Sequence, residues 1–150
     1  TVRLTGTVGN TLEKRAVSVL AVGKTRRLML VDDSVSVRRI VSKMMVRAGF
    51  EVVTAVDGQD ALEQLRRDQD FYAVLSDLEM PRMNGYELIE SLKAREETRS
   101  LPIIVMTTRA GEKHRDLAFR LGAGEYFSKP IEEVRLLNYL NQLEPLILAS

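Results

Sequence analysis

The sequence predicts a doubly wound α/β fold, in which five helices cover a parallel five-stranded sheet. Three observations predict it. From residue 27 onward, short apolar runs alternate with longer segments whose apolar residues recur at helical spacing. Parallel neighbouring strands need long right-handed crossovers, which these helices supply. Several apolar runs end directly on polar residues, as expected at the sheet edge where α/β proteins bind ligands.

The amino-acid composition limits which classes of protein are possible. The chain has 150 residues, a formal net charge of +1 and no cysteine. These values suit one domain in a reducing compartment, and they give no sign of nucleic-acid binding. No apolar run approaches the roughly 20 residues of a membrane span. We therefore expect a soluble cytoplasmic domain with neither a membrane nor a nucleic-acid partner.

The N-terminal segment differs in charge from the rest of the chain. Residues 1–26 hold five basic groups and the single acidic residue Glu13. We assign 1–26 to a leader or linker, 27–145 to the folded domain and 146–150 to a C-terminal tail. Within the leader, a short helix is predicted over Thr11–Ala21.

The first half of the domain contains two predicted strands and two helices. Leu28–Val31 is a continuous apolar run, typical of a strand covered on both faces. Ser34 is a good N-cap for the next helix, which Gly49 ends in the C′ position. Glu51–Ala55 is the second strand, and the turn Asp57-Gly58 opens the second helix.

The second half of the domain repeats the alternation three times. Its strands are short apolar runs bounded by glycine, proline or polar residues. The predicted elements are a strand over Tyr72–Ser76, a helix from Asn84 or Gly85 to Ala94, a strand over Pro102–Met106, a helix over Gly111–Leu121, a strand over Glu125–Phe127 and a helix over Ile131–Leu143. Pro145 is expected to limit the last helix.

Polar side chains stand at the ends of four predicted strands. They are Asp32 and Asp33 after the first strand, Asp77 after the third, Thr107 and Thr108 after the fourth and Lys129 after the fifth. Three carboxylates held close together repel one another unless a cation joins them, and Mg²⁺ prefers such oxygen ligands. A lysine and a hydroxyl suit phosphoryl oxygens. The set predicts phosphoryl transfer with Asp77 as the nucleophile.

Four motifs in this order resemble those of the two-component receiver domain, the CheY-like phosphoacceptor module of response regulators. They are Val31-Asp32-Asp33-Ser34, Ser76-Asp77-Leu78-Glu79-Met80-Pro81 with Gly85, Met106-Thr107, and Tyr126 followed by Lys129-Pro130. The resemblance covers about residues 27–143 and implies a flavodoxin-like fold with the strand order 2-1-3-4-5. It implies a Mg²⁺ site formed by Asp32, Asp33, Asp77 and the backbone carbonyl of Glu79.

The resemblance also implies partners and a switch. Asp77 would accept a phosphoryl group from a phosphohistidine on a histidine kinase or a histidine phosphotransfer domain, while Lys129 and Thr107 bind the phosphoryl oxygens. Thr107 would move toward the phosphate, and Tyr126 would turn inward. This would change the face of the fourth helix, fifth strand and fifth helix, where a downstream output protein binds. In this family the peptide bond of Lys129-Pro130 is often cis.

Three residues flank the predicted site. We expect Glu79 and Arg109 to face each other and to form an ion pair that restricts the attacking water. Thr108 stands where the family often has alanine or glycine, and it is expected to slow phosphoryl entry. The single histidine, His114, is expected on the exposed side of its helix.

The wider context of the domain has two interpretations. The segment 106–115 resembles that of receivers fused to the C-terminus of chemotaxis-type hybrid histidine kinases, and the basic leader is consistent with a linker. A free-standing single-domain response regulator is the alternative. A Mg²⁺-dependent aspartyl-phosphate phosphatase would also use such acids, and a pseudo-receiver that only binds a partner would require a broken acid site. The domain itself is expected to catalyse only its own phosphorylation and dephosphorylation.

Overall fold

The computed structural model describes residues 26–109 and 111–149 of the chain. The helix predicted over Thr11–Ala21 and nearly all of the leader lie outside the described residues. The compact unit Arg26–Leu136 contains the whole sheet, the helices α2 to α5 and the first turn of α6, whereas the rest of α6 belongs to a second unit.

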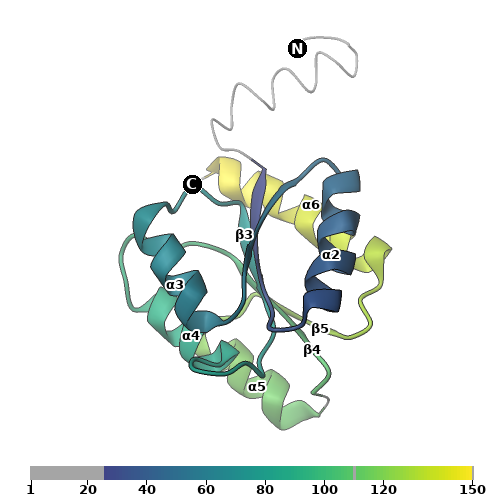
Figure 1. Cartoon of the computed structure of the whole chain (residues 1–150). Helices are drawn as coiled ribbons and strands as arrows, with labels where there is room; N and C mark the ends of the chain where they lie inside the picture. The colour runs from purple at the N-terminus through teal and green to yellow at the C-terminus, as the bar shows by residue number, and fades with distance from the viewer. Residues whose placement is uncertain (1–25, 110, 150) are drawn as a thin grey trace, which may run out of the picture. The chain divides into compact units, whose positions relative to one another are not determined.

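Five strands alternate with five helices in the described part of the chain (Figure 1). The strands are β1 (Arg27–Val31), β2 (Glu51–Ala55), β3 (Ala73–Ser76), β4 (Ile103–Thr107) and β5 (Glu125–Ser128). The helices are α2 (Val35–Arg47), α3 (Gly58–Arg67), α4 (Gly85–Lys93), α5 (Glu112–Leu121) and α6 (Glu133–Ala149). Every element predicted over these residues is present, and most of the boundaries lie within two residues of the expected positions.

The prediction that Pro145 limits the last helix is wrong. Helix α6 runs from Glu133 to Ala149 and includes this proline. Proline removes one N–H donor from a helix and its ring crowds the carbonyl four residues earlier, but its fixed φ is a helical value, so a helix can include it at a cost in stability. Residues 146–149, which we assigned to a tail, are therefore helical.

The strands form one parallel sheet in the order β2-β1-β3-β4-β5, as predicted. Val31 is paired with both Ala55 and Ser76, so β1 ends level with its two neighbours. Thr107 is paired with Ser128 at the ends of β4 and β5. This register gathers the residues that follow the strands at a single edge of the sheet.

Helices cover both faces of the sheet (Figure 1). Helices α3, α4 and α5 pack side by side on one face, and α2 lies on the other against β1 and β2. The central strands are buried on both sides, as expected for parallel strands. One core cluster includes Met29, Val31, Val74, Ile103 and Val105 from the strands and Leu65, Leu88, Ile89 and Leu92 from the helices.

Side-chain caps determine where three helices begin. The Ser34 side chain accepts a hydrogen bond from the N–H of Val37 at the start of α2. Asp57 caps α3, and Asn84 forms a reciprocal capping box with Glu87 on α4. Two of these caps, Ser34 and Asn84, end the loops that follow β1 and β3, and they therefore set the lengths of the loops at the sheet edge.

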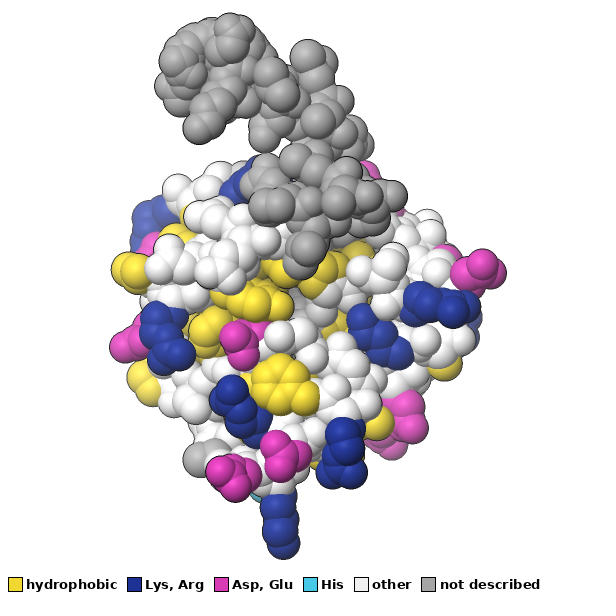
Figure 2. Space-filling view, turned by 180° about the vertical axis from the view of Figure 1, so that it is seen from behind, with side chains coloured by type: hydrophobic (Ala, Val, Ile, Leu, Met, Phe, Trp, Pro, Cys, Tyr) yellow, Lys and Arg dark blue, Asp and Glu magenta, His cyan; other side chains and the backbone are white. Residues whose placement is uncertain are grey.

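The surface has a mixed charge on the face shown in Figure 2, where basic, acidic and apolar side chains are interspersed. A basic patch of the kind that nucleic-acid-binding proteins carry is not visible on this face. None of the helices that the structure describes combines the length and apolar character needed to cross a membrane.

Candidate functional site

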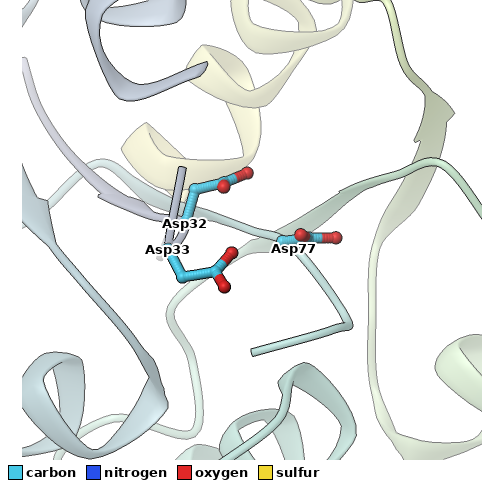
Figure 3. A group of neighbouring side chains, drawn as sticks. All are labelled: Asp32, Asp33 and Asp77. Carbon is cyan, nitrogen blue, oxygen red and sulfur yellow. The ribbon is translucent and has the colours of Figure 1, made fainter. Parts of the chain in front are cut away.

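Three carboxylates meet at the carboxyl edge of the sheet (Figure 3). Asp32 and Asp33 follow β1, and Asp77 follows the adjacent strand β3. One oxygen from each carboxylate lies within 4.8 Å of the others. Asp32 and Asp77 are buried, whereas Asp33 is exposed, so the cluster is open to solvent on the side of Asp33.

Lys129 lies between two of these carboxylates. Its Nζ donates a hydrogen bond of 2.6 Å to Asp32 Oδ2 and lies 3.2 Å from Asp77 Oδ2. Burial alone would lower the pKa of Lys129, but the Asp32 and Asp77 carboxylates outweigh burial and raise this pKa. The lysine is therefore charged and partly compensates the buried acids. The peptide bond between Lys129 and Pro130 is cis.

The backbone holds the acidic residues in place. The Asp77 N–H donates to the carbonyl of Val31 across the sheet, and Asp77 Oδ1 accepts a 2.7 Å hydrogen bond from the N–H of Leu78. Asp32 Oδ1 accepts from the N–H of Ser34, and the Asp32 carbonyl accepts from Arg38 at 2.6 Å. Backbone N–H groups therefore orient both carboxylates. The contact of Arg38 could not be predicted from the sequence, because an arginine in a helix gives no local signal for such a contact.

The two threonines at the end of β4, Thr107 and Thr108, have different environments. Thr107 is fully buried, and its Oγ1 accepts a 3.1 Å hydrogen bond from the N–H of Arg109. The Thr107 carbonyl accepts from the N–H of Lys129, which joins the ends of β4 and β5 beside the acids. Thr108 is exposed.

The expected ion pair between Glu79 and Arg109 is present. Nη2 and Nε of Arg109 lie 2.6 and 2.8 Å from Glu79 Oε2, and both side chains are about half exposed. A pair this exposed contributes little to stability. It links the loop after β3 to the loop after β4.

Tyr126, the residue to which the resemblance assigns a switch role, lies in β5 near the site. The side chain is buried, and its hydroxyl donates a 2.7 Å hydrogen bond to the carbonyl of Arg109. Burial is the main reason that the pKa of Tyr126 is raised. Arg109 therefore contacts Thr107 through its N–H, Tyr126 through its carbonyl and Glu79 through its guanidinium.

The prediction that His114 is exposed is wrong. This histidine is half-buried, with Nδ1 3.0 Å from the Tyr86 hydroxyl and Nε2 3.4 Å from Nη1 of Arg109. The reason is that α5 packs against α4, so the side of α5 that carries His114 faces Tyr86. Arginine only donates hydrogen bonds, so Nε2 is the acceptor and Nδ1 carries the proton in the neutral ring.

The acidic cluster fits a small, hard divalent cation. Octahedral Mg²⁺ with bonds of about 2.1 Å places its ligand oxygens roughly 3 to 4.2 Å apart. The three carboxylate oxygens, all within 4.8 Å of one another, need to close only slightly to reach these separations. The donors are all oxygens, which is the ligand type that Mg²⁺ prefers.

The fold and this edge of the sheet together define a class of protein. A parallel sheet in the order 2-1-3-4-5, with an acidic cluster and a paired lysine at its carboxyl edge, is the arrangement of a receiver domain. The chain belongs to the response regulator receiver domain family, whose model matches residues 28–141. It is thus a CheY-like receiver domain of two-component signalling.

Similar proteins include a chemotaxis protein and a transcriptional regulator. A chemotaxis protein CheY homolog of Campylobacter jejuni is 34% identical over 105 residues, which cover 69% of this chain and 81% of the homolog. The transcriptional regulatory protein CpxR of Escherichia coli is 35% identical over 111 residues, which cover 74% of this chain and 46% of CpxR.

Solved structures show the same fold. Vibrio cholerae chemotaxis protein CheY4 is 31% identical, with a TM-score of 0.73 over 79% of this chain and 98% of that chain. The receiver domain of a sensor histidine kinase from Pseudomonas aeruginosa is 26% identical, with a TM-score of 0.74 over 81% of this chain and 98% of that chain. The latter was solved with a magnesium ion coordinated in its active-site cleft.

Proposed function

We propose that this receiver domain accepts a phosphoryl group on Asp77 from a phosphohistidine, with Mg²⁺ held by Asp32, Asp33, Asp77 and the backbone carbonyl of Glu79. The observation that carries the proposal is the oriented, buried Asp77 carboxylate, with a lysine ammonium 3.2 Å from one of its oxygens. When bound, Mg²⁺ would neutralise negative charge on the phosphoryl oxygens.

The chain's own residues would perform the transfer. An Asp77 carboxylate oxygen forms a bond to phosphorus while the bond from phosphorus to the donor histidine breaks, and the electron pair stays on the imidazole nitrogen. Lys129 moves its Nζ from the carboxylates to a phosphoryl oxygen, and the Thr107 hydroxyl donates to another. The product is an acyl phosphate on Asp77, and its hydrolysis returns the carboxylate.

The proposal includes partners and a context. The phosphodonor is a histidine kinase or a histidine phosphotransfer domain. A downstream protein binds the face of α5 and β5 around Tyr126. We favour a cytoplasmic location and the C-terminal receiver of a hybrid histidine kinase, with a free-standing regulator as the alternative. Similarity to both a kinase receiver and a chemotaxis protein supports these two contexts.

The proposed function is tested by the intact mass of the protein after incubation with acetyl phosphate. We expect a gain of one phosphoryl group with Mg²⁺ and no gain when the metal is removed with a chelator. The carboxylates and the incoming phosphoryl group are all negative, so they repel each other without the cation. Equal labelling in the presence of the chelator would contradict the metal requirement, and no labelling in either condition would contradict the function.

Reversing one charge of the Glu79–Arg109 pair is expected to shorten the lifetime of the phosphate. In Glu79→Arg the two guanidinium groups repel, so the two loops no longer shield the aspartyl phosphate from water. Exposed ion pairs are weak, so hydrolysis should become only about two- to fivefold faster. The measurement is the decay of the phosphorylated mass after the donor is removed.

The matched control for this variant restores the pair with the charges exchanged, as Glu79→Arg with Arg109→Glu. The decay rate should return toward that of the wild type. An unchanged rate in the single variant would show that the ion pair does not govern access of water to Asp77.

A further inference from the structure

The loop between Asp77 and α4 contains a strained backbone turn. Arg82 has a φ of 65°, and no other non-glycine residue in the described part of the chain has a positive φ. The N–H of Met83 donates a 2.7 Å hydrogen bond to the carbonyl of Pro81, so Arg82 is the centre of a γ-turn. A non-glycine residue in this region strains the backbone. Other contacts must therefore hold the turn.

One such contact is a bidentate ion pair with Asp57. Arg82 Nε lies 2.7 Å from Asp57 Oδ2, and Nη2 lies 3.1 Å from Oδ1. The Asp57 side chain is only 5% exposed, and Arg82 holds the pKa of this carboxyl below its usual value. Two parallel hydrogen bonds from a guanidinium fix its orientation as well as its distance. The pair therefore ties the loop directly to the start of α3.

The backbone provides a second contact at the same place. The N–H of Gly58 donates to the carbonyl of Met83 at 3.1 Å. A Cβ atom at Gly58 would lie 2.7 Å from that carbonyl oxygen, so only glycine allows this approach. The first residues of α3 thus hold Arg82 and Met83 from one side.

The same loop contains Glu79, whose backbone carbonyl is a proposed cation ligand. Its ends are joined, because the N–H of Gly85 donates to the carbonyl of Leu78 at 2.9 Å. Glu79 lies between this closed end and the strained turn at Arg82. The path of the loop after Asp77 is therefore set by two anchors, one at Leu78 and one at Asp57.

We propose that Asp57 and Arg82 form a positioning pair, which holds the loop after Asp77 so that the main chain of Glu79 faces the cation site. The inference rests on the proposed function, because it concerns the affinity of the same site for Mg²⁺. Neither residue binds the cation; the pair acts by fixing the turn that follows the ligand. Relaxing the turn lets the Glu79 carbonyl leave the site, which weakens cation binding.

The test compares Mg²⁺ affinity in five proteins, the wild type, three single variants and one double variant, by isothermal titration calorimetry, with urea unfolding as a parallel measurement. Arg82→Ala removes the guanidinium, and Asp57→Asn removes the charge but keeps the side-chain oxygen that caps α3 by accepting from the N–H of Asp60. Arg47→Ala is the matched control, since Arg47 also forms an ion pair, with Glu133. Its side chain is 63% exposed, against 61% for Arg82. It lies at the far end of α2 from Asp33.

We expect the Kd for Mg²⁺ to rise about tenfold in Arg82→Ala and in Asp57→Asn, which is the size of effect seen when residues that orient a ligand are removed. The Kd for Mg²⁺ should rise no more in the double variant than in either single variant, because the two residues act as one pair. Arg47→Ala should bind like the wild type.

A purely structural role for the pair would lower the free energy of unfolding and leave the Kd unchanged, and that result would overturn the inference. Equal weakening in Arg47→Ala would also overturn it. If the wild-type protein itself binds no Mg²⁺, the metal site of the proposed function is wrong. Equal Mg²⁺ binding by the wild type and Arg82→Ala is a different result, which contradicts only the positioning role of the pair.

Discussion

Replacing Asp77 with asparagine is expected to abolish phosphoryl transfer to this protein. The amide keeps the size and most contacts of the carboxylate but is a far weaker nucleophile, so no acyl phosphate forms. The side-chain oxygen can still accept the hydrogen bond from the N–H of Leu78, so the fold should be preserved. The measurement is intact mass after incubation with acetyl phosphate and Mg²⁺, in which Asp77→Asn should gain nothing.

The control for this experiment is Asp116→Asn, which removes an exposed carboxylate from α5. It should be labelled like the wild type. Labelling of Asp77→Asn to the wild-type extent would place the phosphoryl group on another residue and would contradict the assignment of Asp77. Peptide mapping of the phosphorylated wild-type protein would then identify the true acceptor.

Replacing Gly85 with alanine is expected to destabilise the fold by about 3 kcal/mol, an overpacking effect at the upper end of the usual range. A Cβ atom at Gly85 would overlap the carbonyl oxygen of Asp77 and lie 2.8 Å from the Leu78 Cα. Both contacts are backbone atoms, which no side-chain rotation can move. Because the overlap displaces the Asp77 carbonyl, phosphorylation should fall as well. Urea unfolding at neutral pH measures the stability.

Gly49→Ala separates this steric effect from backbone strain. Gly49 has a φ of 96° and no atom within 4 Å of an added Cβ, so its replacement costs only the strain, about 1 kcal/mol. Alanine favours helices over glycine, and Gly85 is the first residue of α4. A gain of stability in Gly85→Ala would therefore contradict the close packing of α4 against the backbone at Asp77.

Much of the fold was predictable because its signals are local. The apolar runs of the central strands and the cap at Ser34 are each encoded within a few residues, and so is the glycine that ends α2. The order of the strands follows from the resemblance to the receiver family, because the rules for parallel crossovers fix their handedness and not the strand order. That order places Asp32 and Asp77 on neighbouring strands, so their proximity could be inferred before any coordinates were known.

Other features depend on contacts between segments far apart in the chain. His114 is half-buried because α5 packs on α4 and brings it to Tyr86, whereas its charged neighbours in the sequence indicate an exposed position. The continuation of α6 through Pro145 differs from the prediction for another reason. The rule that proline ends a helix is statistical rather than absolute.

The sequence by itself determined the class of fold and the composition of the candidate site, since both follow from periodicity and from which residues end the strands. Only the tertiary structure decided how that site is held. The pairing of Asp57 with Arg82 joins residues 25 positions apart, and the strained turn that it holds has no local sequence signal. Such contacts depend on the rotamers and packing of side chains from different elements, which the pattern along a single chain does not encode.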